Sequence, residues 1–356
     1  MINLSPFSFL SSIAKTKSTD INNPINKTKI LLQQQISVSL LNLYRAYTYN
    51  LSIGCNQKPL SIVRNLITTT QKIFNKRKKI LFYPDFPYRK ATLYQICLFL
   101  GYDVTNNSKE KFDLVIKWQR YKTFFSEEPI LSRLSKQNFD VINFHCQDVS
   151  KSLTNQLFDE AFGYSITVNP LTYTGKCVVK SNLNAQHDGR IISCPTDKIE
   201  LGVVYQKLID NEIEEEKVLE YRVPVFRQKI PCIYIYIKKN KTETQRFFGY
   251  PSLISVEVVE TKEIFDEDEI RKILSFCQKL GLDYGELDIL RDKIDKRIYI
   301  VDANNTPSSR LLFEPLVLPL EKCILDPEDR QLALQKMAEV FQKEFFNIDK
   351  SEITPP

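Results

Sequence analysis

Short apolar stretches alternate with amphipathic stretches over residues 80–168, and this alternation predicts strands that alternate with helices. Each expected helix is followed by a glycine, the residue that most readily ends a helix. The expected elements are buried strands at Ile80–Tyr83, Phe112–Trp118 and Phe139–Phe144, and helices at Thr92–Leu100 and Ser152–Phe162. This pattern is typical of a small α/β domain built on a parallel sheet.

From about residue 169 the pattern becomes rich in strands. Strands are expected at Cys177–Lys180, Arg190–Ser193, Gly202–Leu208, Val218–Phe226, Ile230–Ile237, Leu253–Glu260, Leu282–Leu290 and Arg297–Asp302. Asp266 and Glu269 form a capping box for a helix that ends before Gly281. A last helix is expected at about 327–346.

The first residues differ from the rest of the chain. Residues 1–28 are rich in Ser, Thr and Asn and are expected to be a flexible basic lead-in, and two helical patterns follow. The expected division is therefore a lead-in at 1–28, a helical extension at 29–79, a leading α/β domain at 80–168, a strand-rich domain at 169–325, and a C-terminal helix and tail at 326–356.

Charge is distributed unevenly along the 356 residues, whose net charge is +6. Residues 1–80 hold twelve Lys or Arg and a single acid, so the remainder is mildly acidic. An acidic body argues against specific nucleic-acid binding, although the basic extension could make weak contact with an anionic surface. The sequence does not fix the oligomeric state.

Several protein classes are excluded by missing patterns. Nine glycines form neither G-x-G-x-x-G nor a P-loop, and two histidines make a histidine-built metal centre improbable. No apolar run is long enough for a transmembrane helix. Eight cysteines without a C-x-x-C pair are typical of reduced, buried thiols. A cytoplasmic location is expected, with organellar targeting as a minor alternative.

The segment 281–310 carries the clearest chemistry. Alternation along the first of its two strands places Glu286 and Asp288 on one face, and Asp302 and Asn304 share a face of the second. Oxygen ligands from adjacent strands, without histidine or thiolate, suit Mg²⁺. In the turn between the strands, Asp292 and Asp295 are expected to be solvated.

This segment resembles the C-terminal metal site of the ATP-grasp superfamily, which includes glutathione synthetases, D-Ala–D-Ala ligases and ribosomal-protein glutamate ligases. The shared pattern is a D-x-[ILV] strand, a turn, an apolar strand and then [ED]-x-N-x-x-P. The resemblance implies that Asp288, Asp302 and Asn304 hold the Mg²⁺ that bridges the nucleotide phosphates. The family more often has Glu where Asp302 stands.

The resemblance extends over about 170–312 and implies an ATP-grasp-like fold, α/β and α+β, with its nucleotide- and Mg-binding domain at 169–325. Lys176 and Lys180 are similar to the lysine-ended strand that meets the nucleotide. Asn184 and His187 lie where the family has a glycine-rich phosphate-covering loop, here with glycine only at position 189.

Further matches complete the implied site. Gln206, Lys207 and Leu208 resemble the strand and hinge whose backbone groups bind adenine. Arg222 resembles the arginine of the family's D-x-R-V strand, and Arg246 resembles a second such arginine. Lys180, Arg222 and Arg246 are the implied catalytic residues, since strand cations can meet developing negative charge on phosphate.

The resemblance implies an ADP-forming ligase that joins a small carboxylate, such as an amino acid or peptide, to an amine, with ATP and Mg²⁺ as cofactors. Two alternatives stay open: an ATP-grasp-like small-molecule kinase, and a non-catalytic nucleotide-binding or scaffold protein. The leading domain is the candidate acceptor side. Residues at its expected strand ends are Asp85, Tyr88, Arg89, Asn143, Phe144, His145 and Cys146, and the last of these invites a thiol-nucleophile interpretation.

Overall fold

The computed structural model describes residues 78–120, 122–186, 188–239, 253–308, 325 and 327–346. The chain divides into two compact units, Met1–Arg77 and Lys78–Pro356, and the structure described below is that of the second. The expected lead-in at 1–28, almost all of the extension at 29–79, and residues 347–356 of the tail lie outside the described residues.

The second unit begins with a four-stranded parallel sheet of order β2-β1-β3-β4. Its elements are β1 (Lys79–Pro84), α4 (Thr92–Leu100), β2 (Asp103–Thr105), β3 (Leu114–Trp118), α5 (Pro129–Lys136) and β4 (Val141–Ile142). Strands and helices alternate as the apolar pattern predicts, and α4 ends at a left-handed Gly101. The leading sheet is thus parallel, as expected.

A larger sheet of antiparallel strands has the order β11-β10-β9-β12-β13, with β8 paired to β9. Its strands are β8 (Glu212–Glu214), β9 (Lys217–Phe226), β10 (Ile233–Lys239), β11 (Leu253–Val259), β12 (Tyr284–Arg291) and β13 (Ile298–Asn304). The helices α6 (Lys151–Phe162), α7 (Thr261–Ile264) and α8 (Glu267–Leu280) belong to the same region.

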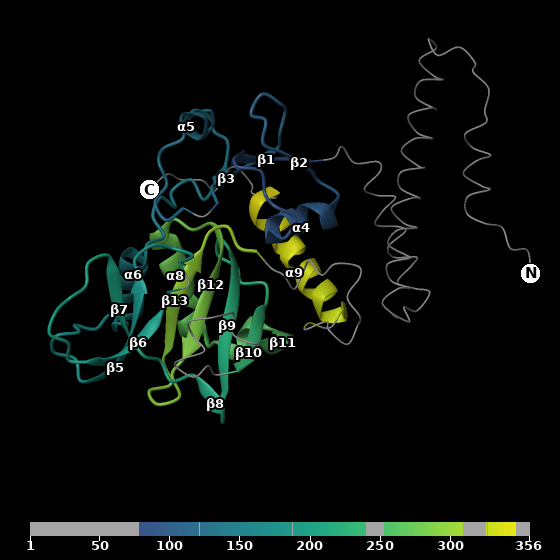
Figure 1. Cartoon of the computed structure of the whole chain (residues 1–356). Coiled ribbons are helices and arrows are strands. Elements are labelled where there is room, and N and C mark those ends of the chain that lie inside the picture. The colour runs from purple at the N-terminus through teal and green to yellow at the C-terminus, as the bar shows by residue number, and fades with distance from the viewer. Residues whose placement is uncertain are drawn as a thin grey trace, which may run out of the picture. The chain divides into compact units, whose positions relative to one another are not determined.

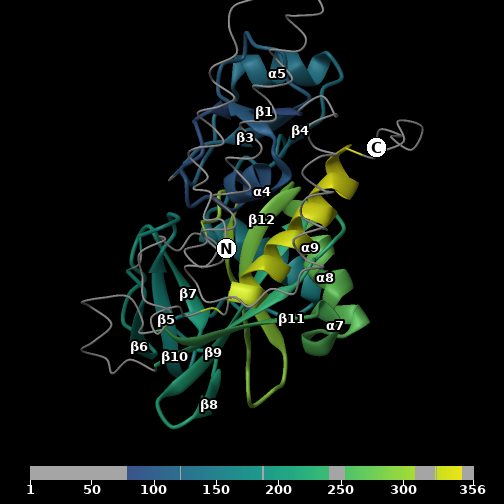
Figure 2. The same ribbon diagram turned by 90° about the vertical axis from the view of Figure 1, so that its right-hand side faces the viewer.

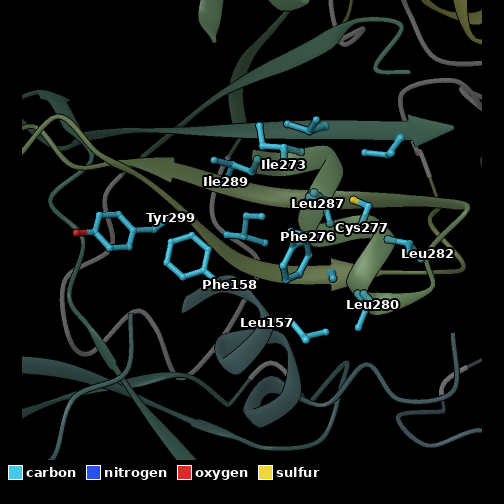
Figure 3. Close-up of a cluster of buried hydrophobic side chains, with 14 of the residues drawn as sticks. Leu157, Phe158, Ile273, Phe276, Cys277, Leu280, Leu282, Leu287, Ile289 and Tyr299 are labelled. Carbon is cyan, nitrogen blue, oxygen red and sulfur yellow. The ribbon is translucent and has the colours of Figure 1, made fainter. Parts of the chain in front are cut away.

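One face of the larger sheet is apolar and is covered by helices. Figure 3 shows Leu157 and Phe158 of α6 and Ile273 and Phe276 of α8 in one apolar cluster with Leu287 of β12. Because side chains alternate along a strand, the residues between these apolar positions face the opposite side of the sheet. That opposite face of the larger sheet carries the polar residues of the candidate site.

A third, three-stranded antiparallel sheet has the order β6-β5-β7. It consists of β5 (Gly175–Ser181), β6 (Arg190–Cys194) and β7 (Val203–Lys207). Figures 1 and 2 show this sheet beside the larger sheet, with the leading sheet at one end of both. Cys177 and Val179 form its small buried core, so Lys176 and Lys180 lie on the other side of β5.

The last helix, α9 (Pro327–Phe346), packs against α4, β9 and β11 (Figure 2). Its Phe341 and Phe345 rings contact Phe226 of β9 in a core that also holds residues of the leading sheet. A shared core therefore joins the leading sheet to the larger one. None of the described helices is long and apolar enough to cross a membrane.

The strand expected over Phe139–Phe144 is wrong in its extent, because the chain turns at Asn143, which has a positive φ of 62°. The Asn143 side chain donates to the Tyr284 carbonyl at 2.8 Å and accepts from the Tyr284 N–H at 2.8 Å. A buried side-chain amide that satisfies both backbone groups of one residue fixes this connection. Asn143 therefore joins the end of the leading sheet to β12.

Gly281 ends α8 as expected, and its replacement tests the packing between α8 and the leading sheet. A Cβ atom there would lie 2.6 Å from the carbonyl carbon of His145, and φ is 68°. We expect Gly281→Ala to lower the free energy of unfolding by about 2–4 kcal/mol in urea denaturation. Gly202→Ala is the matched control, because φ is 76° there but nothing lies within 4 Å. Equal losses for both variants would contradict the close packing.

Candidate active site

Three adjacent strands bring acids and an arginine into one row. Asp288 of β12 lies directly opposite Asp302 of β13 and, on its other side, opposite Arg222 of β9. Glu286 lies opposite Asn304. Side chains at directly opposite positions of antiparallel strands are close enough to interact, with Cβ atoms about 5 Å apart. The register thus brings together all three residues expected to hold Mg²⁺.

Arg222 is surrounded by carboxylates. Its Nη1 lies 2.7 Å from Asp288 Oδ1 and 3.5 Å from Glu286 Oε1, and its Nε donates to Glu220 Oε1 at 2.7 Å. Lys238 of β10 binds the other oxygen of Glu220 at 2.6 Å. The polar face of the sheet therefore holds its buried charges in a continuous network of ion pairs.

Burial decides the protonation of these acids. It raises the pKa of Asp288 well above its usual range, and the neighbouring acids Glu220 and Asp302 add to this effect against the attraction of Arg222. Burial also raises the pKa of Glu286. Glu220 is half-buried, and burial raises its pKa, but Arg222 and Lys238 together hold the pKa below the usual value. A cation added near Asp288 would therefore be favoured.

Two lysines face the acids from other elements. Lys151, the first residue of α6, is buried, and its Nζ lies 3.1 Å from Asp302 Oδ1. Lys180 of β5 has a pKa lowered by burial and by Lys151, while attraction from Asp302 and Asp288 opposes the change. Lys151 thus supplies positive charge at Asp302, and Lys180 at both Asp302 and Asp288.

Sequence reasoning missed Lys151, although one signal was present. The lysine follows Ser150, whose side chain accepts from the Leu153 N–H and so begins α6. A positive charge in the first turn of a helix opposes the helix dipole, so a lysine there needs a partner. Asp302, far away in the sequence, is that partner.

The segment expected to cover the phosphates is bound to α6. Asn182 accepts from the Lys151 N–H through its carbonyl at 3.1 Å and from the Ser152 N–H through its side chain at 2.8 Å. The Asn184 N–H donates to Thr123 Oγ1 at 2.8 Å, while Asn184 itself is half-buried. His187 lies outside the described residues.

Residues expected to bind the nucleotide base adjoin the end of β7. Gln206 is buried, and its Nε2 donates to Asn155 Oδ1 of α6 at 2.7 Å. Leu208, directly after β7, is half-buried. The side chain of Gln206 is therefore used within the fold, which leaves backbone groups as the expected contacts.

The Lys207 ammonium is also held within the fold. It lies 2.8 Å from Asp292 and 2.8 Å from Asp295 in the turn after β12. The expectation that Asp292 is solvated is wrong, because its exposed fraction is only 1%. The Lys207 ammonium compensates the buried carboxylate of Asp292. Asp295 is exposed, as expected.

Two further positions predicted from the sequence are Lys176 and Arg246. Lys176 is exposed, on the same face of β5 as Lys180 but four residues earlier along the strand. Arg246 lies outside the described residues.

The residues of the leading domain play mainly structural parts. Asp85 accepts from the Arg120 N–H at 2.9 Å, and Arg89 and His145 are exposed. Cys146 is fully buried, and burial raises the pKa of its thiol to about 12. Because the thiolate is the nucleophilic form, this environment disfavours the thiol-nucleophile interpretation.

The residues suit magnesium better than a metal held wholly by protein. Within the described ranges, no group of three or more His, Cys, Asp or Glu side chains is arranged to hold a metal ion. Magnesium usually takes one or two carboxylates and completes its shell with water and substrate phosphates. Asp288, Asp302 and the Asn304 amide, all oxygen donors at neighbouring positions, fit that requirement.

Three sheets follow one another along the chain. A leading parallel sheet precedes the three-stranded antiparallel sheet with Lys180, and the larger antiparallel sheet carries the acids. The fold is ATP-grasp-like.

Solved structures similar to this chain include three ligases. D-alanine–D-alanine ligase from Bacillus anthracis is 14% identical with a TM-score of 0.46, covering 78% of this chain and 99% of that one. The ATP-grasp ligase PsnB, solved with a minimal precursor, Mg and ADP, is 13% identical with a TM-score of 0.47, covering 75% and 99%. The macrocyclase MdnC from Microcystis aeruginosa MRC, bound with precursor peptide MdnA, is 14% identical with a TM-score of 0.38, covering 74% and 98%.

No protein-family model matches the chain, and a search of curated proteins finds no match either.

Proposed function

We propose that this protein is an ATP- and Mg²⁺-dependent carboxylate–amine ligase that releases ADP. The observation that carries the proposal is the row of Arg222, Asp288 and Asp302 on three adjacent strands, with Lys151 and Lys180 facing it. Such a site pairs acids that can hold a hard cation with cations that can hold phosphate. This combination is what transfer of a phosphoryl group requires.

Asp288, Asp302 and Asn304 would hold the magnesium ion, which when bound neutralises charge on the nucleotide phosphates. In the structure as described, Arg222 and Lys151 provide the positive charge at these acids. Arg222 and Lys151 carry N–H groups that would also be able to donate to phosphate oxygens.

The proposed reaction has two steps. A substrate carboxylate oxygen attacks the γ-phosphorus of ATP, and ADP leaves with the electrons of the broken P–O bond. An amine nitrogen then attacks the carbonyl carbon of the acyl phosphate, phosphate leaves, and the nitrogen loses a proton. Arg222 and Lys180 stabilise the charge on the transferred group, Arg222 with a planar pair of donors and Lys180 as a point charge.

A hydroxylamine assay tests the proposal without knowledge of the acceptor. Hydroxylamine is a small amine that converts an acyl phosphate into a stable hydroxamate. We expect ADP and hydroxamate in equal amounts when the full chain, Mg²⁺, ATP, hydroxylamine and pooled amino acids, peptides and sugar acids are combined. ADP release with alcohols instead would indicate a kinase, and no ADP with any pool would favour a scaffold.

Removal of the Lys180 ammonium tests the phosphate side of the site. Lys180→Ala removes a charge-assisted contact, which costs about 1.5–3 kcal/mol, or roughly ten- to 150-fold in ATP affinity. Lys198→Ala is the control, because Lys198 is exposed in the turn after β6. Calorimetric titration with Mg²⁺ and ATP measures both variants. Unchanged affinity in Lys180→Ala would remove this lysine from the site.

A further inference from the structure

Four buried polar atoms that have no hydrogen-bond partner outside their own group in the described chain gather where α4 begins. They are Thr92 Oγ1, Trp118 Nε1, Arg120 Nε and Tyr284 OH. Thr92 is the first residue of α4, Trp118 ends β3, and Tyr284 begins β12. Buried polar atoms are nearly always paired, so two donors without a partner, Trp118 Nε1 and Arg120 Nε, beside two hydroxyls that bond only to each other, point to a missing ligand.

These residues are neighbours in space. Trp118 and Tyr284 belong to one core cluster, against which Tyr88 packs. Tyr284 interacts with Thr92 and with Tyr88, and the Arg120 guanidinium lies 5.8 Å from the centre of the Tyr88 ring. Thr92 is 2% exposed, Trp118 and Tyr284 are fully buried, and Tyr88 and Arg120 are half-buried. The half-buried pair therefore marks the side open to solvent.

All four groups can donate. An indole N–H and a guanidinium can only donate, and the Thr92 and Tyr284 hydroxyls, which bond to each other, have one proton left to donate. The buried Oε1 of Gln119, between Trp118 and Arg120 in sequence, is an acceptor without a partner. The α4 N-terminus adds its backbone dipole, and its cap residue, Ala91, makes no side-chain capping bond. Donors with a positive helix end select an anion.

The cluster is connected to the acidic row of the candidate active site. Along β12, Tyr284 and Asp288 are four residues apart on one face, which is about 13 Å. Glu286 lies between them and interacts with Tyr284. From the other side, the Thr92 N–H donates to the Pro307 carbonyl at 3.2 Å, three residues beyond Asn304. An extended molecule of dipeptide size spans the distance.

We propose that Thr92, Trp118, Arg120 and Tyr284 form a subsite that binds a second carboxylate of the substrate whose first carboxyl group is activated at the acidic row. This inference rests on the proposed function, because it is that function which places a substrate carboxyl group beside Arg222. The inference adds a substrate class to the proposed function: molecules with two anionic groups, or peptides with a free carboxylate.

A carboxylate fits these groups better than a phosphate. Arg120 is the one cation among the four residues, and a carboxylate carries one charge where a phosphate monoester carries nearly two at neutral pH. Asp85, whose carboxylate accepts from the Arg120 N–H at 2.9 Å, would repel a doubly charged group more strongly. Apolar side chains of the leading sheet enclose the rest of the cluster.

Trp118 provides a direct measurement, because it is the chain's single tryptophan. A hydrogen bond from its indole N–H to a carboxylate alters its fluorescence emission. We titrate the full chain, with Mg²⁺ and ADP present, with glutarate, its uncharged diamide glutaramide, and inorganic phosphate at fixed ionic strength. We expect a saturable change in emission with glutarate, none with glutaramide, and a weaker response to phosphate.

Substitutions show which residues produce the fluorescence response to glutarate. Arg120→Gln should weaken glutarate binding at least about tenfold, since it removes a charge-assisted contact. Thr92→Val, which keeps the shape of the side chain, should weaken it less. Arg133→Gln, at an exposed arginine of α5, should leave it unchanged.

Three outcomes would overturn the subsite: no saturable response to glutarate in the wild type, an equal response to glutaramide, or full affinity in Arg120→Gln. Stronger binding of phosphate than of glutarate would overturn the carboxylate assignment. Calorimetry with Mg²⁺ and ADP on the same protein separates this failure from failure of the proposed function. Nucleotide binding without a glutarate response removes the subsite alone, and absence of nucleotide binding removes the proposed function.

Discussion

Asp288→Asn is expected to lower turnover at least about a hundredfold while leaving the folded protein as stable as before, or slightly more stable. The substitution keeps the volume of the side chain but removes a carboxylate that would hold Mg²⁺. Stability should not fall, because burial already raises the pKa of Asp288 and so disfavours its charged form in the folded state. Arg222 keeps its ion pair with Glu220 in the variant.

ADP release and thermal unfolding measure the two halves of this prediction on one preparation. Asp197→Asn is the matched control, because Asp197 is exposed in the turn after β6. It should leave both quantities unchanged. Retained turnover in Asp288→Asn would remove the carboxylate from the metal site. A large fall in melting temperature would mean that Asp288 stabilises the fold rather than serving the reaction.

Arg222→Met is expected to lower the free energy of unfolding by about 3–5 kcal/mol at pH 7, because it leaves the buried Glu286 and the half-buried Asp288 without their cation. Turnover should be lost as well. Arg222→Lys keeps the charge but loses the planar pair of donors, so it should lower turnover more than it weakens ATP binding. Urea denaturation measures the first effect, and steady-state kinetics with calorimetry measures the second.

The pH dependence of the Arg222→Met deficit has a definite sign. Burial gives Asp288 and Glu286 pKa values above those of the unfolded chain, so the folded state binds protons more tightly. Stability from these groups is therefore gained as pH falls through the raised pKa values. Without the guanidinium these values rise further, so the deficit should be largest near neutral pH and shrink toward pH 5. A deficit that stays constant with pH would show that lost packing, not unpaired charge, is the cause.

Local signals were sufficient to predict most elements of the fold. The helix α4 has the expected bounds, and α8 begins at its capping box and ends at Gly281, because each boundary is set by residues within one turn. The helix α5 was not predicted, since Leu131 and Leu134 are the only apolar residues of its eight that become buried. The strand β4 is shorter than predicted because the chain turns at Asn143. The partner of Asn143, Tyr284, lies in another sheet, so no local signal could reveal this turn.

The candidate site likewise has features that local sequence predicts and features that it does not. Alternation within β12 and β13 was sufficient to place Asp288 beside Asp302, because the two strands form one hairpin. The burial of Asp292 against Lys207 and the ion pair of Lys151 with Asp302 both join segments far apart in sequence. Periodicity carries no information about such pairs, so a lysine in a first helical turn and an acid in a turn look solvated.

The dependence of ATP binding on Mg²⁺ tests the central claim most directly. Phosphates that approach without a divalent cation meet the Asp302 carboxylate and find Lys151 and Arg222 already paired with acids, whereas with Mg²⁺ they meet a positively charged site. Calorimetric titration of the full chain with ATP should therefore show binding with Mg²⁺ that is lost when the metal is chelated, and Asp302→Asn should bind weakly in both conditions. ATP binding that is equally strong with and without Mg²⁺, or no binding in either, would contradict the account.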